Sequence, residues 1–263
     1  MTPTVYDITT IDQQTFTSKF EEDGFVLVNN IFPEELLDDI NSVILGCVNH
    51  EADTYHHRKH KDYGMLLCCP VYGAPFTTIL DHESFFKPFN WLLGDNCIVW
   101  VYTSSCIAPK QTNFASRIHL ERTIFTGDFI DGVGSLILLD DFNESNGATY
   151  LLKGSHKNLE KPEDERFYKE AIRLVAPKGT VLYFNLRLWH AGGQNHTVKW
   201  RNSLGIGVNR PYLKQRIDIP RILPQAVKDK LSDYAKNKLG FNVQVPSSFE
   251  EYYRNEKKSY TNK

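Results

Sequence analysis

Two histidines and a glutamate have the spacing that a metal ion needs. His119 and Glu121 are two residues apart in segment 117–122, where polar and apolar residues alternate as in a strand with one buried face. Side chains two apart in a strand project from the same face, so both can approach one ion. His190 follows a second strand-like segment and is the candidate for a third ligand. Two imidazoles and one carboxylate form the facial triad of non-haem Fe(II) oxygenases, which keeps coordination positions open for a co-substrate and oxygen.

Other assignments of this site stay open on the sequence alone. A His-x-Glu pair often occurs by chance, and a surface strand can carry one without any metal. Asp140 or Asp141 could replace Glu121 as the carboxylate ligand, although neither has the strand spacing to His119. The same three ligands with a bound water would also suit a zinc hydrolase. The metal hypothesis therefore depends on further residues.

Arg201 is one such residue. It follows His190 by eleven positions, and residues 191–200 are predicted to form a hairpin connection that brings Arg201 across the ladder from His190. Ser203 shares a strand face with Arg201. A guanidinium that forks onto a carboxylate, helped by a hydroxyl, suits the distal carboxylate of 2-oxoglutarate, whose other end chelates the metal. A zinc hydrolase or a passive metal-binding protein leaves this arginine unexplained.

Several other polar or aromatic side chains flank the predicted site and are candidates for contact with a substrate. Each of them is equally compatible with a structural role, and together they do not identify the substrate. They are Tyr102, Gln111, Arg117, Arg122, Trp189 and Arg210.

The elements that must position these residues form a mainly β core with flanking helices. Short apolar and β-branched runs between turn residues predict strands at 97–102, 136–139, 149–152, 180–184 and 203–208. Strands at this spacing are typical of a jelly roll, the cupin-like double-stranded β-helix.

Helical periodicity predicts helices over 10–22, from Pro33 and over 80–93, and a charged insertion lies at 157–170. We expect one domain spanning residues 1–263. It comprises an N-terminal helical part at about 10–95, a jelly-roll core at about 97–212 and a C-terminal helix at about 224–239.

In the order of its segments, the chain resembles the phytanoyl-CoA dioxygenase-like family of 2-oxoglutarate-dependent oxygenases. The resemblance covers most of the chain. Residues 22–35 are similar to the family's N-terminal helix–strand–helix, 146–157 to its NGA…GSHK segment, and 179–193 to the part with the distal histidine. The spacing from His190 to Arg201 also matches that from the family's distal histidine to its oxoglutarate-binding arginine.

The resemblance implies Fe(II) held by His119, Glu121 and His190, with 2-oxoglutarate bound by Arg201 and Ser203. It also implies that O₂ and the decarboxylation of 2-oxoglutarate to succinate drive oxidation of an unactivated C–H bond. Halogenating relatives replace the carboxylate ligand by a small residue, so Glu121 favours hydroxylation, with desaturation or ring formation as alternatives. The family usually has aspartate here, and glutamate is one methylene longer.

The resemblance also bears on the substrate. Family members act on acyl-CoA thioesters and on free metabolites, and this sequence contains no recognisable coenzyme A motif. We therefore expect a small polar metabolite of a biosynthetic pathway. The rival from another class is a jelly-roll protein that binds a metal or a sugar without turnover.

Composition limits the partners and the compartment. A formal charge of −2 gives no broad positive field for nucleic acid. Five cysteines, none in a CxxC pair, fit reduced thiols in a cytosol. The sequence shows neither a signal peptide nor the run of roughly 18 apolar residues that a membrane span needs, so a cytoplasmic protein is expected. It gives no indication of the oligomeric state.

Overall fold

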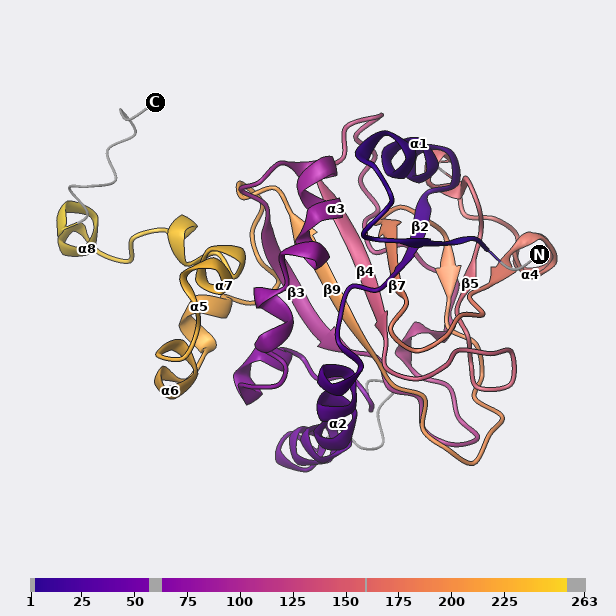
Figure 1. Ribbon diagram of the computed structural model, residues 1–263, viewed down its shortest axis with the longest axis horizontal. Coiled ribbons are helices and arrows are strands. Elements are labelled where there is room, and N and C mark those ends of the chain that lie inside the picture. Colours follow the sequence, from indigo (N-terminus) through magenta and orange to yellow (C-terminus); the bar gives the residue numbers. More distant parts are fainter. Residues whose placement is uncertain (1–2, 57–62, 159, 255–263) are drawn as a thin grey trace.

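The computed structural model describes residues 3–56, 63–158 and 160–254, and two facing β-sheets form its centre (Figure 1). In the larger sheet, β1 pairs in parallel with β2 and the other neighbours pair antiparallel. Its spatial order is β1 (Val5–Asp7), β2 (Phe25–Asn29), β7 (Val181–Asn185), β4 (Gly132–Leu138), β9 (Ser203–Asn209) and β3 (Ile98–Ser104).

The smaller sheet consists of β6 (Ile172–Arg173), β5 (Tyr150–Leu151) and β8 (His190–Ala191), in that order. Apolar side chains of both sheets pack between them, among them Leu151 of β5 and Leu182 of β7. The predicted jelly roll is therefore confirmed, as an open sandwich rather than a closed barrel. All five predicted strands form, although β4 begins at Gly132 rather than at 136.

Strand β7 shows how the sequence sets the two faces of the larger sheet. Leu182 and Phe184 pack towards the smaller sheet, whereas Val181 and Tyr183 belong to the core under the helices. An uninterrupted apolar run fits a strand that is buried on both faces. The Tyr183 hydroxyl donates a hydrogen bond to the Phe85 carbonyl at 2.9 Å, so its polar end is satisfied inside this core.

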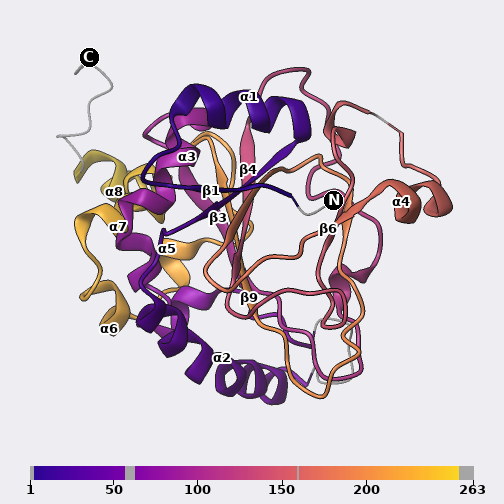
Figure 2. The same cartoon turned by 45° about the vertical axis from the view of Figure 1, so that its right-hand side comes forward.

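Helices cover the outer face of the larger sheet (Figures 1 and 2). They are α1 (Gln13–Asp23), α2 (Glu34–Thr54) and α3 (Glu83–Leu93), which confirms the predicted N-terminal helices. Helix α1 ends at Gly24, whose φ of 84° is a conformation that glycine adopts without strain. Strand β2 begins at the next residue, so this turn sets how α1 lies against the sheet.

The predicted insertion at 157–170 contains α4 (Asp164–Glu170), whose Phe167 packs with Leu152 and Ala191 beside the smaller sheet (Figure 2). Short 3₁₀ turns complete the connections: η1 (Cys69–Tyr72), η2 (Thr78–Asp81), η3 (Phe114–Ser116), η4 (Ser155–Lys157) and η5 (Phe241–Val243).

The predicted single helix over 224–239 is wrong. Two short helices form instead, because the Ser232 side chain accepts a hydrogen bond from the Ala235 amide at 3.0 Å and caps a new start. The C-terminal helices are α5 (Ile219–Ile222), α6 (Gln225–Lys228), α7 (Asp233–Lys238) and α8 (Phe249–Arg254).

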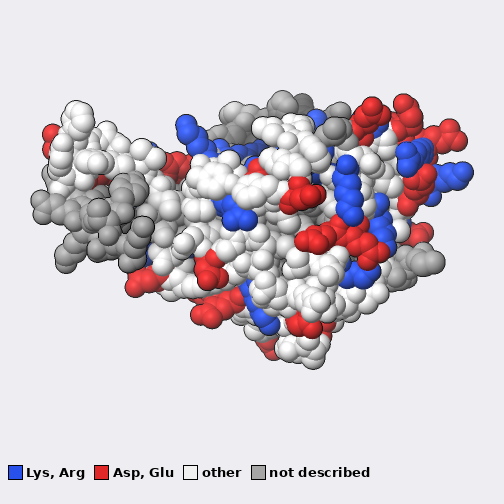
Figure 3. All heavy atoms as spheres, turned by 90° about the horizontal axis from the view of Figure 1, so that it is seen from above, with Lys and Arg blue, Asp and Glu red and all other residues white. Residues whose placement is uncertain are grey.

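Basic and acidic side chains lie next to one another on the face seen in Figure 3, so that face carries no broad positive field. Among the described residues, no helix combines the length and the apolar composition that crossing a membrane requires.

Candidate metal centre

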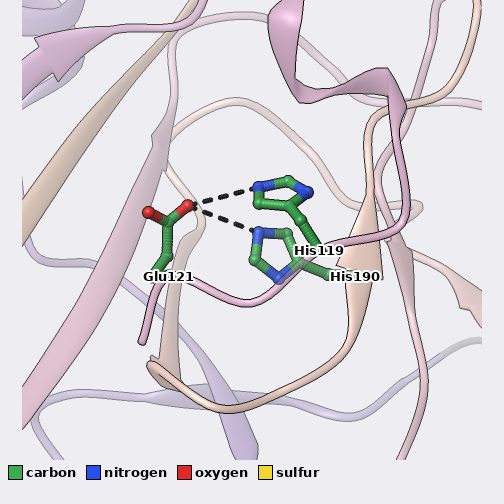
Figure 4. Close-up of side chains that lie close together, drawn as sticks. All are labelled: His119, Glu121 and His190. Carbon is green, nitrogen blue, oxygen red and sulfur yellow. Dashed lines mark ion pairs between the residues drawn. The ribbon is translucent and has the colours of Figure 1, made fainter. Parts of the chain in front are cut away.

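Three side chains from two distant parts of the sequence, His119 and Glu121 in one and His190 in the other, converge on one point (Figure 4). Their ligand atoms all lie within 4.8 Å of one another. Glu121 Oε1 is 3.4 Å from His119 Nε2 and 3.6 Å from His190 Nε2. Ligand atoms about 2.1 Å from a shared ion lie roughly 3–3.5 Å apart, which these separations approach. We call these three residues the metal cluster.

The backbone holds the two histidines opposite each other. The His119 amide donates to the His190 carbonyl at 2.9 Å, and the His190 amide donates back at 3.1 Å. The predicted strand over 117–122 is wrong, because this reciprocal pair is an isolated bridge. His119 and Glu121 nevertheless reach the same point, as their spacing of two residues predicted.

Hydrogen bonds to the backbone orient both imidazoles. Nδ1 of His119 lies 2.8 Å from the Arg117 carbonyl oxygen, and Nδ1 of His190 lies 2.8 Å from the Leu188 carbonyl oxygen. Because a carbonyl can only accept, each Nδ1 must carry the proton and donate it. In the form with a proton on Nδ1 alone, each ring directs an Nε2 lone pair at Glu121, which is the tautomer that a metal ligand requires.

Glu121 is the negative and most exposed member of the cluster. Burial alone would raise the pKa of its carboxyl, but the two imidazoles beside it, when their Nε2 atoms carry protons, outweigh burial and hold this pKa well below its ordinary value. Its side chain is 38% exposed, against 16% for His119 and 10% for His190. Three acceptors facing one another repel unless positive charge lies between them, as protons on Nε2 or as a metal ion. The donor set therefore fits a divalent metal.

Strands β4 and β7 build the support for the His190 ring. Phe184 packs edge-on against that ring, with the ring centroids 5.3 Å apart. Gly134 is the partner of Phe184 across the ladder, and a Cβ added there would lie 2.4 Å from Phe184 Cζ. A residue without a side chain is needed at this position, so Gly134 helps to set where Phe184 holds His190.

Gly134→Ala is expected to lower the melting temperature, because the new methyl group overpacks the Phe184 ring. Overpacking costs about 1–3 kcal/mol, and in a chain of this size each kcal/mol shifts the melting temperature by roughly 2–4 °C. Thermal unfolding followed by circular dichroism measures the shift. Gly46→Ala in α2 is the control: its Cβ would meet nothing within 4 Å, and alanine favours a helix by about 0.5–1 kcal/mol. An unchanged melting temperature in Gly134→Ala would contradict the close packing.

A cavity of about 110 Å³ lies beside the metal cluster, between the two sheets. Leu151 of the smaller sheet and Leu182 of the larger sheet line it, together with all three members of the cluster. Arg201 lines the same cavity. We call this space the inner cavity.

Arg201 reaches the inner cavity by a different route from the predicted hairpin. His190 begins β8 of the smaller sheet, whereas Arg201 bridges to Ile107 and lies two residues before β9 of the larger sheet. The prediction that Arg201 lies across a ladder from His190 is therefore wrong. The loop between them crosses from one sheet to the other, so the two side chains approach the cavity from opposite sheets.

The Arg201 guanidinium is buried with little to compensate its charge. It is 2% exposed, and the Phe142 ring lies 4.3 Å from its Cζ. In the described part of the chain its Nε has no hydrogen-bond partner. Burial lowers the pKa of Arg201 to about 10, so it stays charged at neutral pH. A buried cation without an anionic partner is unfavourable, and an anion in the cavity would relieve it.

Ser203 supports Arg201 rather than lining the inner cavity. Its Oγ accepts a hydrogen bond from Arg201 Nη1 at 3.5 Å and donates one to the Ser105 carbonyl at 2.8 Å. Ser203 is fully buried and is not among the residues around the cavity. The predicted pairing of the arginine with a hydroxyl is present, but the hydroxyl holds the arginine in place and does not itself reach the cavity.

The two alternative carboxylates are engaged elsewhere. Asp140 accepts a hydrogen bond from the Asn202 amide at 2.6 Å, and Asp141 accepts one from the Lys178 amide at 2.8 Å. Neither belongs to the metal cluster. Of the three carboxylates considered, Glu121 is the one that the fold brings to the histidines.

Three of the predicted substrate residues are built into the framework. Tyr102 is buried in the core under the helices and donates to the Phe76 carbonyl at 3.0 Å. Trp189 packs with Phe167 beside the smaller sheet. Arg210 donates hydrogen bonds to three backbone carbonyls at 2.9, 3.0 and 3.4 Å. None of the three lines the inner cavity.

The remaining predicted substrate residues also lie outside the inner cavity. Gln111 and Arg117 are exposed, and Arg122 forms an ion pair with Asp131 at 2.6 Å. Three hydroxyl residues that were not predicted do line the cavity, namely Thr103, Ser105 and Thr149. Thr103 lies in β3 and Ser105 just after it, so their spacing of two residues, which places side chains on one face of a strand, was the signal that could have revealed them.

Comparisons with known proteins agree with this geometry. The family model of phytanoyl-CoA dioxygenase (PhyH) matches residues 20–203, a range that contains the metal cluster and Arg201. An uncharacterized protein of Mycobacterium tuberculosis, Rv1501, is 29% identical over 198 residues, which cover 73% of this chain and 72% of that protein. The dioxygenase olcK of Penicillium canescens is 27% identical, over 84% of this chain and 78% of that protein.

Two further matches bear on chemistry and fold. A probable alpha-ketoglutarate-dependent hypophosphite dioxygenase of Stutzerimonas stutzeri is 24% identical, over 72% of this chain and 76% of that protein. The apo structure of the non-haem monooxygenase ThoJ aligns with a TM-score of 0.63 at 16% identity, over 77% of this chain and 80% of that one, which shows a shared fold. Because the family model matches most of the chain, this protein belongs to the phytanoyl-CoA dioxygenase (PhyH) family.

Proposed function

We propose that this protein is an Fe(II)- and 2-oxoglutarate-dependent dioxygenase that hydroxylates an unactivated C–H bond of a small metabolite, with release of succinate and CO₂. The observation that carries the proposal is Arg201, a buried guanidinium with an unpartnered Nε in the same cavity as two histidines and a carboxylate. A dicarboxylate that chelates a metal with one end needs such a receptor for its other end. A relative named as alpha-ketoglutarate-dependent supports the co-substrate.

The residues present fit Fe(II). His119 and His190 offer Nε2 and Glu121 offers Oε1, a donor set that this ion favours and that leaves positions free for a chelating co-substrate. When bound, Fe(II) and 2-oxoglutarate supply the oxidising power that couples O₂ to a C–H bond. Leu151 and Leu182 keep the inner cavity apolar around the co-substrate.

The protein itself holds the metal ligands in place, orients the bound molecules and excludes competing ligands. The Arg117 and Leu188 carbonyls fix the two imidazoles. The exposed side of Glu121 leaves one direction open for a substrate. A carboxylate there also takes the coordination site that a halide would need, so hydroxylation is favoured, and the way a substrate is held decides between hydroxylation, desaturation and ring formation.

The decisive experiment has two steps. Anaerobic addition of 2-oxoglutarate to the Fe(II)-loaded protein should produce the visible charge-transfer band of the chelate. Admitting air, with a panel of small polar metabolites, should release succinate. No band and no succinate would overturn the proposal and leave a metal-binding jelly roll as the better account.

Glu121→Asp is expected to keep measurable turnover, because aspartate provides the same carboxylate on a side chain one methylene shorter. The shorter side chain would shift the position of the ion, and productive geometry tolerates a displacement of only about 0.5 Å. Succinate formation at saturating Fe(II) measures the effect. Glu121→Gln is the matched variant, of equal length but without the charge, and should be less active than the aspartate variant. Loss of iron binding in Glu121→Asp would show that the site requires the longer side chain.

A further inference from the structure

A second, larger cavity of about 570 Å³ lies next to the inner cavity. Loop residues 122–132 form one wall, and Asn185 to Arg187, with Lys157, form another. The two cavities adjoin at consecutive residues: Glu121 lines the inner one and Arg122 the outer one, and the same holds for Phe184 and Asn185. We call this second space the outer cavity. Glu121, the most exposed member of the metal cluster, directly precedes Arg122 of the outer cavity in the chain.

Arg187 is the buried charge of the outer cavity. It is 6% exposed, and its Nη2 donates to the Asn158 carbonyl at 3.2 Å. Its Nε and Nη1 are buried and have no hydrogen-bond partner among the described residues. The Phe125 ring lies 4.2 Å from the guanidinium carbon, which supports the planar group without satisfying its N–H donors.

The other charges around the outer cavity do not neutralise Arg187. Arg122 and Asp131 neutralise each other at 2.6 Å. Lys157, Asp128 and Glu21 are exposed to solvent, where water screens them. Buried polar groups in folded proteins are nearly always paired, so the free donors of Arg187 call for a partner that enters the cavity.

The loop wall of the outer cavity, which contacts Arg187 through Phe125, is apolar. Ile124, Phe125 and Phe129 are 69%, 47% and 50% exposed, and all three lie in the loop that lines this space. Large apolar side chains exposed together beside a cavity are a feature of ligand sites. The outer cavity thus offers one buried cation and one apolar surface.

We propose that Arg187 binds an anionic group of the substrate, a carboxylate or a phosphate, while the apolar loop covers the substrate's hydrocarbon part. This inference rests on the proposed function and names the substrate class. The arrangement repeats that of Arg201: each cavity contains one buried, incompletely paired guanidinium lying on a phenylalanine ring. An anion on Arg187 would hold the substrate next to the open side of Glu121.

The test measures binding of simple probes to the Fe(II)-loaded protein under nitrogen, with 2-oxoglutarate saturating so that Arg201 is occupied. Benzoate and phenyl phosphate offer the two anion types on one ring, and benzamide is the neutral analogue. In calorimetric titrations, Arg187→Gln should weaken the better-bound anion by about ten- to hundredfold, as expected for charge-assisted hydrogen bonds. Benzamide binding should not change. Arg166→Gln is the control, because it removes an exposed arginine on α4.

The melting temperature distinguishes an arginine that binds a ligand from one that stabilises the fold. Replacing an unpaired buried cation by an apolar side chain of similar length relieves the desolvated charge, so Arg187→Met should melt at or above the parent's temperature. Weakened anion binding with an undiminished melting temperature supports the inference. Unchanged anion binding, or weakened binding in a variant that melts several degrees lower, overturns it. The 2-oxoglutarate charge-transfer band is recorded on the same samples, so failure of the proposed function is seen separately.

Discussion

Alanine in place of His119, Glu121 or His190 is expected to lower 2-oxoglutarate turnover by more than about a hundredfold while the protein stays folded. Loss of an outer partner of a metal ligand alone costs 10–100-fold, and loss of a ligand itself removes more. The fold should survive because the core is built from the apolar strand and helix residues, and the cluster lies at its exposed edge. Succinate release and circular dichroism on the same samples measure both effects.

Two surface variants serve as controls for this loss. Glu144→Ala and His196→Ala remove the same side-chain types at exposed positions outside the inner cavity, and both should turn over like the parent protein. Near-normal turnover in Glu121→Ala would show that the carboxylate ligand is misassigned. Asp140 or Asp141 would then have to leave its present hydrogen bonds to reach the histidines.

Arg201→Lys should weaken the apparent affinity for 2-oxoglutarate by roughly ten- to hundredfold. Lysine keeps the charge but loses the planar fork, and charge-assisted hydrogen bonds of this kind contribute about 1.5–3 kcal/mol, where about 1.4 kcal/mol is a factor of ten. Iron binding should be nearly unchanged, because Arg201 is not a member of the metal cluster. Anaerobic titration followed at the charge-transfer band measures both quantities.

Arg210→Lys is the matched control, because this half-buried arginine also lies over a phenylalanine ring but is outside the inner cavity. It should leave the 2-oxoglutarate titration where it is in the parent protein. If Arg201→Lys also left the titration unshifted, the main support for a 2-oxoglutarate enzyme would be gone. The metal cluster would then be better explained as a passive binding site.

The core strands could be predicted because their signal is local. Val181 to Phe184 is an unbroken apolar run, and such a run between turn residues has few alternatives to a strand buried on both faces. The start of β4 was missed because Gly132, Gly134 and Ser135 have low strand propensity. Gly134 is there to make room for the Phe184 ring, a requirement that comes from the neighbouring strand.

The residues of the metal cluster could also be predicted, although the sequence explains their proximity only in part. A spacing of two brought His119 and Glu121 together without any continuous strand. Arg201 was identified correctly as a neighbour of the inner cavity, but through a hairpin that does not exist. Whether residues 191–200 return along one sheet or cross to the other is decided by packing between sheets, which no local pattern encodes.

The role that we propose for Arg187 could not be predicted from the sequence, because it depends on burial. Arg117 and Arg187 look alike in sequence, each a short distance before a histidine of the cluster. The fold leaves Arg117 exposed and buries Arg187 with unpaired donors beside the outer cavity. Water satisfies the donors of an exposed guanidinium, so an arginine indicates a ligand only when its surroundings show that it is buried and unpaired.

The isolated bridge between the two histidines has a consequence for local motion. Residues 105–131 contain no strand, and two such bridges, Ile107 with Arg201 and His119 with His190, tie this arm to the sheets. An ion shared by Glu121 and His190 would act as a cross-link that clamps the arm. Amides near His119 should then exchange with deuterium faster in the metal-free protein than in the loaded one, while amides in β4 and β7 exchange alike in both.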